Sequence, residues 1–497
     1  MPGSCRPKFL SKRPRCLERS VALKLFALFI SIVAIPSVMA QQSKAKTQSS
    51  KSPSGTGRVV TAGCKNCNQQ AGQPAAGTHA GQVVIAEPEI ATSGEVFSGS
   101  ETVEHDWSEG AECDACHTDD YGISECDGGM NCNSGGGLFG FGLWSRLSVR
   151  AEVPLFWRKG HTTPALVTTS HQGTAADVAG QLGRSTTQIL QGGTFGQDVN
   201  AGFRITLGTW FDPCQNYGFL FRYWNAGQRD DRNVFDSNQF PILARPFRNT
   251  STNPAENDTQ LIAFTDDTGT QSTGNVSVRG SSDLYGLDVS LRRLLYTDRF
   301  TRFDWLYGYQ HLSLDEQLAI DSSTTVINLP PLQGSTIAVS DSFRTQNLLH
   351  GTTSGFLYNR KFGCWQLETM FRLGLGNLYR EVQVQGRTTT TSNAASSTQN
   401  QGLLARNTNS RTIVDNTFVI SPEVGINLAY AITPAMDFTV GYHYLMVPKV
   451  YQAADLIDPG LRVNLSDPPT GALDPALNLS PGRYWVRTLG LGLQVRY

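Results

Sequence analysis

The last thirteen residues of the chain, from Trp485 to Tyr497, alternate between apolar and polar side chains almost without a break. From Leu489 onward the odd-numbered positions are apolar and the even-numbered positions are small or polar. Successive side chains of a β-strand point to opposite faces, so this segment predicts a strand with one apolar and one polar face. Such a strand would leave an aggregation-prone edge in an open sheet, whereas a closed barrel has no edge. The segment therefore favours a barrel, and a strand of a soluble sandwich is the alternative.

The same alternation recurs along the second part of the chain and predicts ten strands. They cover residues 146–157, 201–211, 217–223, 285–292, 303–309, 342–358, 365–375, 418–430, 436–444 and 485–497. The connections between them are alternately long and short, as in outer-membrane barrels, which have short periplasmic turns and longer external loops. A sandwich has no reason to keep this rhythm. We therefore predict an all-β fold, an antiparallel up-and-down transmembrane β-barrel of about ten strands over residues 143–497.

The N-terminus has the pattern of an export signal. Basic residues between Arg13 and Lys24 precede or enter an apolar run over residues 25–34, and small residues follow up to Ala40. This pattern predicts a signal peptide over residues 1–40. A membrane anchor is the alternative, but the apolar run is shorter than the roughly 20 residues that a spanning helix needs. With the barrel, the export signal predicts the cell outer membrane as the location, with the N-terminal extension and the C-terminus in the periplasm.

Residues 41–142 have little apolar periodicity and are rich in Gly, Ser, Ala and Gln. Such a composition buries too little apolar surface to fold alone, so we expect a low-complexity periplasmic extension that is disordered or stapled by disulfides. An even number of cysteines in an exported chain predicts disulfides, with the pairing left open. Without the signal peptide eight cysteines remain: Cys64, Cys67, Cys113, Cys116, Cys126, Cys132, Cys214 and Cys364. The last two fall in or beside short turns at one barrel end, where they could pair with each other or with the extension, or stay as buried thiols.

One cysteine pair has the spacing of a haem attachment site. Cys113 and Cys116 precede His117 in a CxxCH pattern, in which two thiols bind the haem and the histidine ligates the iron. No apolar helices surround the motif to bury a haem, and Cys64 and Cys67 share the CxxC spacing without the histidine. Zinc held by these residues with Cys126 or Cys132 is possible by ligand type, but oxidising surroundings disfavour it. We therefore expect no cofactor and no metal.

Two further function classes find little support in the sequence. A barrel hydrolase needs a histidine beside an acidic residue or a nucleophile. His161, His171, His311, His350 and His443 are available, but no nucleophile motif accompanies them, so an enzyme is not expected. The formal net charge of −1 gives no electrostatic footprint for nucleic acid.

Charged residues of both signs fall on the polar face of the expected strands, and we expect them to line the pore. Ten strands enclose a narrow lumen, and buried charges must pair there because an isolated buried charge is so unfavourable. We therefore predict a narrow channel for small polar solutes; the alternative is a structural or adhesive barrel that acts through its long, solvated loops, such as 388–393. The expected pore-lining residues are Arg150, Glu152, Arg204, Arg222, Asp288, Arg292, Asp304, Glu368, Arg372 and Glu423.

Three segments of the chain resemble the BBP7 family of outer-membrane β-barrel porins. They read LWSRLSVRAEVPLFWRKGHTTPALVTTS from Leu143, GQDVNAGFRITLGTWFDPCQNYGFLFRYW from Gly196 and LYNRKFGCWQLETMFRLGLGN from Leu357. The resemblance covers roughly residues 138–497 and implies an outer-membrane barrel in contact with outer-membrane lipids. It supplies no substrate and no catalytic residue.

The terminal strand also resembles the last strand of outer-membrane barrels, whose final aromatic residue and alternating apolar residues serve as an assembly signal. This resemblance implies that Leu493, Val495 and Tyr497 form such a signal. It also implies that the barrel-assembly machinery is a partner of the chain.

Overall fold

The computed structural model describes residues 147–212, 214–392 and 395–497. The expected signal peptide, the extension with its six cysteines and the CxxCH motif lie outside the described residues. The described part is an 18-stranded sheet with one short 3-10 helix, η2 (Ala453–Leu456). In these ranges no helix has the length and hydrophobicity to cross a membrane. The predicted all-β, antiparallel architecture is confirmed; one short pairing, between β8 and β17, is parallel.

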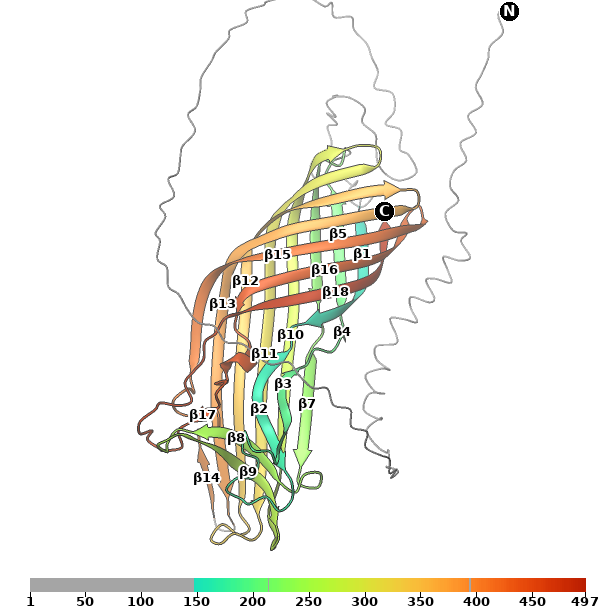
Figure 1. Cartoon of the computed structure of the whole chain (residues 1–497). Coiled ribbons are helices and arrows are strands. Elements are labelled where there is room, and N and C mark those ends of the chain that lie inside the picture. Colours follow the sequence, from blue (N-terminus) through green and yellow to red (C-terminus); the bar gives the residue numbers. More distant parts are fainter. Residues whose placement is uncertain (1–146, 213, 393–394) are drawn as a thin grey trace, which may run out of the picture. The chain divides into compact units, whose positions relative to one another are not determined.

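Ten of the strands pair antiparallel in a closed ring, with β18 pairing back onto β1 along the whole of β1 (Figure 1). The strands of the ring differ in length: β10 has 29 residues and β5 only 8. Short turns join the ring strands at the end where the C-terminus lies, which we call the turn end. The ring strands are β1 (Ser148–Arg158), β5 (Phe203–Trp210), β6 (Tyr217–Asn225), β10 (Gly269–Thr297), β11 (Thr301–Val326), β12 (Thr336–Phe362), β13 (Trp365–Thr391), β15 (Thr412–Thr433), β16 (Met436–Val450) and β18 (Gly482–Arg496).

The predicted count of about ten strands is wrong for the sheet as a whole, which has 18. Segments expected to be solvated loops form additional strands or lengthen the ring strands, and β13 runs through the threonine-rich segment to Thr391. These segments pair because their inward side chains find an apolar core beyond the expected barrel. The additional strands are β2 (His161–Ser170), β3 (Thr187–Phe195), β4 (Asn200–Ala201), β7 (Arg229–Asp236), β8 (Leu243–Asn249), β9 (Glu256–Asp266), β14 (Ser396–Gln399) and β17 (Arg462–Val463).

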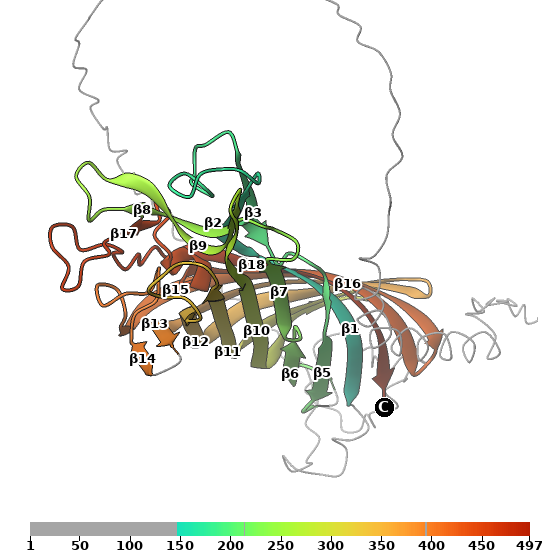
Figure 2. The ribbon, with the colours of Figure 1, turned by 90° about the horizontal axis from the view of Figure 1, so that it is seen from below.

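Five of the additional strands, β2, β3, β8, β9 and β17, form a cap with η2 over one face of the long strands. Figure 2 shows these strands grouped on one side of the wall made by β10 to β13. A buried apolar cluster joins the two parts: Val167 and Leu243 of the cap pack with Leu318 and Phe343 of the wall. This cap core explains why the distal halves of the ring strands are ordered well beyond the segments that the alternation predicts.

The outer surface of the ring carries an apolar belt near the turn end. On β13 the exposed side chains are Phe371, Leu373 and Leu375, and β15 exposes Ile420 and Ile426 at alternate positions. On β11 the outward side chains change from the exposed aromatics Tyr307 and Tyr309 to the polar Asp315 and Gln317. An outward apolar band with aromatic residues at its edges is the surface that transmembrane barrels present to lipid. The belt assigns the turn-end halves of the strands to the membrane, and the cap lies beyond them.

Candidate functional site

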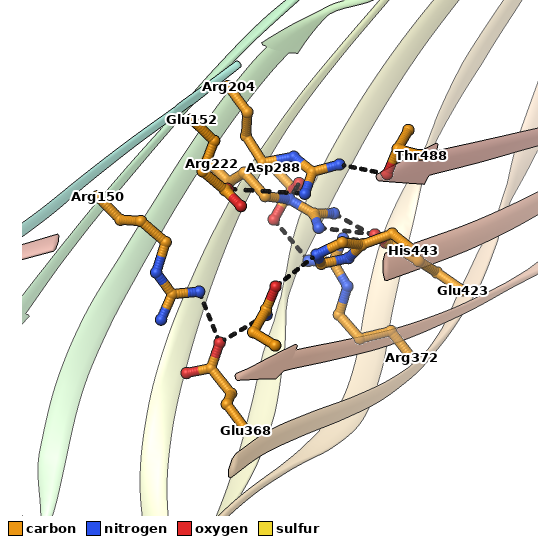
Figure 3. A network of polar contacts seen from close by, with 11 residues as sticks. Arg150, Glu152, Arg204, Arg222, Asp288, Glu368, Arg372, Glu423, His443 and Thr488 are labelled. Atoms are coloured by element: carbon orange, nitrogen blue, oxygen red, sulfur yellow. Dashed lines mark hydrogen bonds and ion pairs between the residues drawn. The ribbon is translucent and has the colours of Figure 1, made fainter. Parts of the chain in front are cut away.

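The charged side chains that the sequence assigns to the lumen all lie on the ring-strand face opposite the apolar belt. Eight of them form six ion pairs across the lumen or between neighbouring strands, close to the middle of the ring (Figure 3). Arg292 and Asp304 form a further pair, with 2.7 Å between Nη2 and Oδ2. The charges pair because an isolated buried charge is so unfavourable. That these residues line a conducting pore stays a prediction.

Four of these residues, Arg222, Asp288, Arg372 and Glu423, form a closed network that we call the cross-lumen bridge. Arg222 and Asp288 face each other on the neighbouring strands β6 and β10, with 2.7 Å between Nε and Oδ2. Arg372 and Glu423 do the same on β13 and β15, with 2.5 Å between Nη2 and Oε2.

Two more contacts join these pairs into one network. Arg222 Nη1 lies 2.6 Å from Glu423 Oε1, and Arg372 Nη1 lies 2.5 Å from Asp288 Oδ1. The four side chains are nearly inaccessible to solvent, and the two positive and two negative charges balance. Each guanidinium therefore holds carboxylates from both walls, and the network ties opposite sides of the barrel together.

A second set of contacts extends the network toward β1 and β18. Arg150 Nη1 reaches Glu368 Oε1 at 2.7 Å, and Asn427 donates to the same oxygen at 2.9 Å. His443 Nε2 lies 3.1 Å from Asn427 Oδ1, which places its ring beside the cross-lumen bridge. These hydrogen bonds leave the middle of the lumen filled with paired polar groups.

Arg204 completes this layer on the side of β5. Its Nη1 lies 3.6 Å from Glu152 Oε2, and its Nη2 donates to Thr488 Oγ1 at 3.1 Å. Asn427, His443 and Thr488 were not among the predicted pore-lining residues, although each lies on the polar face of an expected strand, where the alternation could have identified them.

Inward-facing glycines make room for the long charged side chains. A Cβ atom at Gly355 would lie 2.7 Å from the Cγ atom of Arg372, and one at Gly425 would lie 2.5 Å from the imidazole Nδ1 of His443. Each glycine is the direct cross-strand neighbour of the large residue that it accommodates. Glycine in a strand often marks such a close approach, so these positions fix which charged side chains can fold across the lumen.

An apolar layer, the lumen plug, lies between the cross-lumen bridge and the cap. Every ring strand except β5 contributes to it, and its members are almost completely buried. The plug was not predicted, because the whole lumen face was expected to be polar. The lumen plug consists of Phe156, Trp224, Ala226, Leu284, Leu312, Leu314, Leu349, Leu378, Val419, Val447, Val450, Tyr484 and Val486.

The lumen is less tightly filled at the turn end. Arg302 joins Arg292 on the carboxylate of Asp304, and Arg496 pairs with Asp437 at 2.7 Å. The side chains of Arg150 and Glu368 retain exposed fractions of 12% and 16%. We call this partly exposed polar region between the turn end and the cross-lumen bridge the vestibule.

The terminal strand closes the ring, as the expected assembly signal requires. Val495 pairs with Val149 on one side and with Met436 on the other, and Leu493 pairs with Ala151 and Phe438. The backbone N–H of Tyr497 donates to the carbonyl oxygen of Leu147 at 2.9 Å. Recognition of these residues by an assembly machinery stays a prediction.

The histidines considered for catalysis do not converge on one centre. His443 lies in the lumen on β16 and His161 begins β2 of the cap. His311 and His350 are cross-strand neighbours on the outer wall, with ring centroids 4.5 Å apart. Among the described residues no group of three or more His, Cys, Asp or Glu side chains could hold a metal ion. Cys214 and Cys364 lie in turn-end connections, as expected, and the disulfide prediction stays untested.

A ring of paired strands with an apolar outer belt and a polar, charge-paired lumen defines the class of membrane β-barrels. The family model described as "Putative beta barrel porin-7 (BBP7)" matches residues 148–497, and the chain belongs to this family. The match spans the whole ring and cap, so the resemblance expected from the three sequence segments is confirmed. Membership in a porin family points to the outer membrane.

Comparison with solved structures adds only distant likenesses. The outer membrane protease OmpT from Escherichia coli matches at 9% identity and a TM-score of 0.32, covering 71% of this chain and 97% of its own. A Pseudomonas aeruginosa FadL homologue matches at 8% identity and a TM-score of 0.22, covering 71% and 89%. Scores this low carry no argument about function. No curated protein matches the chain in sequence.

Proposed function

We propose that this protein is an outer-membrane barrel whose lumen is closed at rest and whose cap is its working surface outside the cell. The observation that carries the proposal is the lumen plug, in which almost all ring strands bury apolar side chains toward one another. A barrel of about eight strands has an interior just filled by side chains, and a ring of ten is only slightly wider. An apolar layer in so narrow a lumen leaves no hydrated path for a solute.

The cross-lumen bridge lies on the membrane side of the plug and also supports the proposal of a closed lumen. Its carboxylates and guanidinium groups pair with one another, so a passing ion would have to displace a balanced pair. Separating such a pair in a buried setting is strongly unfavourable. Two successive barriers of different chemistry thus oppose diffusion.

The proposed topology places the turn end in the periplasm and the cap outside the cell. Short turns are the periplasmic feature of outer-membrane barrels, and longer connections face outward. Both ends of the ring, at Ser148 and Arg496, then lie on the periplasmic side.

Surface labelling tests this topology. A cysteine at Thr252, in the exposed β8–β9 connection of the cap, should react with an impermeant maleimide on intact cells. A cysteine at Arg299, in the turn between β10 and β11, should react only after the outer membrane is opened. The protein without an introduced cysteine measures the labelling of the native cysteines. The reverse labelling pattern would refute the topology.

A narrow gated channel is the second candidate, and the vestibule at the turn end favours it. Proteoliposome swelling in small sugars separates the two functions. The wild-type barrel should not increase swelling. Replacement of Leu314 and Leu349 in the plug by serine should increase it, because the change weakens the apolar barrier. Swelling by the wild-type protein would favour the channel over the closed barrel.

A further inference from the structure

The cap contains a polar cleft with a volume of about 980 Å³, which we call the cap cleft. It opens where β8 and β17 run side by side (Figure 2). Its lining comes from residues 248–255, in β8 and the connection to β9, and from residues 458–462 and 470–474, around β17. Ligand-binding pockets have volumes of roughly 300–1,000 Å³, so the cap cleft has room for a small molecule of more than one ring.

The lining of the cap cleft is almost entirely polar. It consists of two arginines, two aspartates, one asparagine and four residues with hydroxyl side chains, with only glycine, alanine and proline between them. Most ligand pockets are instead lined by large apolar and aromatic side chains. An apolar guest would therefore find no complementary surface here, whereas a guest with many hydrogen-bonding groups would.

The two arginines of the cleft lie next to each other but differ in their partners. Arg248 of β8 and Arg462 of β17 are direct partners in the parallel pairing, so their side chains leave the same face of neighbouring strands. Arg462 Nε lies 2.9 Å from Asp458 Oδ2 and 3.9 Å from Asp474 Oδ1. In the part of the chain that the structure describes, the exposed Arg248 forms no ion pair and donates only to the carbonyl oxygen of Ala255, at 3.5 Å. A guanidinium has five N–H donors, so Arg248 keeps most of them for a ligand.

Hydrogen bonds hold the walls of the cleft in place. The backbone N–H of Arg248 donates to the carbonyl oxygen of Leu461 at 2.8 Å, and Leu461 is buried in the cap core. The buried Asn464 amide donates to the carbonyl oxygens of Thr470 and Ala472, at 2.8 and 2.6 Å, and so fixes the connection that forms one wall. A site that is already formed avoids the entropic cost of ordering its loops when the ligand arrives.

The formal charges in the cleft balance, because two aspartates offset two arginines. A lone anion would meet two carboxylates and a lone cation would meet two guanidinium groups, so neither is favoured. The lining offers donors from the arginines and acceptors from the aspartates, and a hydroxyl group is both a donor and an acceptor. A guest with several hydroxyl groups and no net charge therefore fits this lining best.

We propose that the cap cleft binds a saccharide, whose hydroxyl groups accept from Arg248 and donate to Asp474. Asp474 is the freer of the two carboxylates, because Asp458 already accepts from Arg462 and from the backbone N–H of Gly460, both at 2.9 Å. The inference rests on the proposed function, in which the cap lies outside the cell, where such ligands arrive. A soluble polysaccharide and the glycan of an outer-membrane lipid are two sources of the same hydroxyl chemistry.

A glycan array tests the binding, with the labelled full-length protein in detergent as the analyte. The array carries neutral oligosaccharides from soluble polysaccharides and the oligosaccharide part of lipopolysaccharide, so it distinguishes the two sources. We expect binding to at least one neutral saccharide, and titration of that saccharide gives the affinity. No binding to any saccharide on the array, or binding to charged ones only, would overturn the proposal. Because the protein is in detergent, this assay does not depend on the topology, and its failure is distinct from a failure of the cysteine labelling.

Three variants show whether the saccharide occupies the cleft. Arg248→Met removes hydrogen bonds from a charged group and should weaken binding about tenfold or more. Arg279→Met, which removes an exposed arginine outside the cleft, should leave the affinity unchanged. Ala472→Trp adds a large side chain to the cleft without removing a polar group, and should abolish binding. Heat-resistant migration verifies that each variant is folded, and wild-type affinity in folded Arg248→Met and Ala472→Trp would overturn the proposal.

Discussion

Replacing Arg372 by methionine should destabilise the barrel more than any comparable surface change. The substitution keeps much of the side-chain volume but leaves Asp288 and Glu423 with a single guanidinium, that of Arg222. The bridge then holds one uncompensated negative charge. The site is deeply buried, since the native Arg372 has an exposed fraction of 1%. Removing one partner of a buried pair costs about 3–5 kcal/mol, so we expect a loss of this size in the free energy of unfolding.

A double-mutant cycle provides the decisive comparison for the bridge. Glu423→Gln alone leaves one excess positive charge and should cost a similar amount, whereas the double variant retains the balanced pair of Arg222 and Asp288. The double variant should therefore lose no more than either single variant. Equilibrium unfolding in urea, followed by tryptophan fluorescence in detergent micelles, measures all three.

The matched control removes a charge from a pair that solvent already screens. Arg279 and Asp230 are both about half exposed, so Arg279→Met should cause no measurable loss. Additive losses in the cycle, within about 0.5 kcal/mol, would refute the argument that the bridge acts as one unit.

Three further predictions follow from other parts of the chain. Tyr497→Asp should lower the amount of heat-resistant barrel in the outer membrane, because it alters the end of the strand that closes the ring; normal levels would contradict this. Glu316 has a folded pKa of about 7, raised from 4.5 by burial, so the stability that it contributes at low pH is lost as pH rises through 7. Glu316→Gln should therefore gain up to about 3 kcal/mol at about pH 8 and little below pH 4.5, and equal gains at both would exclude this cause. The mature protein should carry no haem on Cys113 and Cys116; a haem-stained band that is lost in Cys116→Ser would show otherwise.

The membrane half of the fold could be predicted because lipid and lumen impose opposite polarity on the two strand faces. On β11 this gives aromatic residues at 303–309 on odd positions and Asp304 on the other face. The same rule identifies the charged lumen residues. It does not say which of them meet, because Arg222 and Glu423 are 201 residues apart and come together only when the ring closes.

The distal halves of the ring strands were expected to be solvated loops, although the sequence contains a signal for them. On β11 the phase of the alternation inverts: Leu312, Leu314 and Leu318 occupy even positions, and the odd positions become polar, as at Asp315 and Gln317. This inversion marks the point where the strand leaves the lipid and its inward face meets apolar core. Strand β2 offered no such signal, because its HTTPALVTTS sequence has no two-residue period.

The central claim is that the lumen plug and the cross-lumen bridge keep this barrel closed at rest. Single-channel recording of the full-length, refolded protein in a planar bilayer tests it most directly. We expect no steady open state in the wild-type protein, because both barriers lie across a ring of only ten strands. A large, stable conductance of the kind that wide porins give would contradict the account.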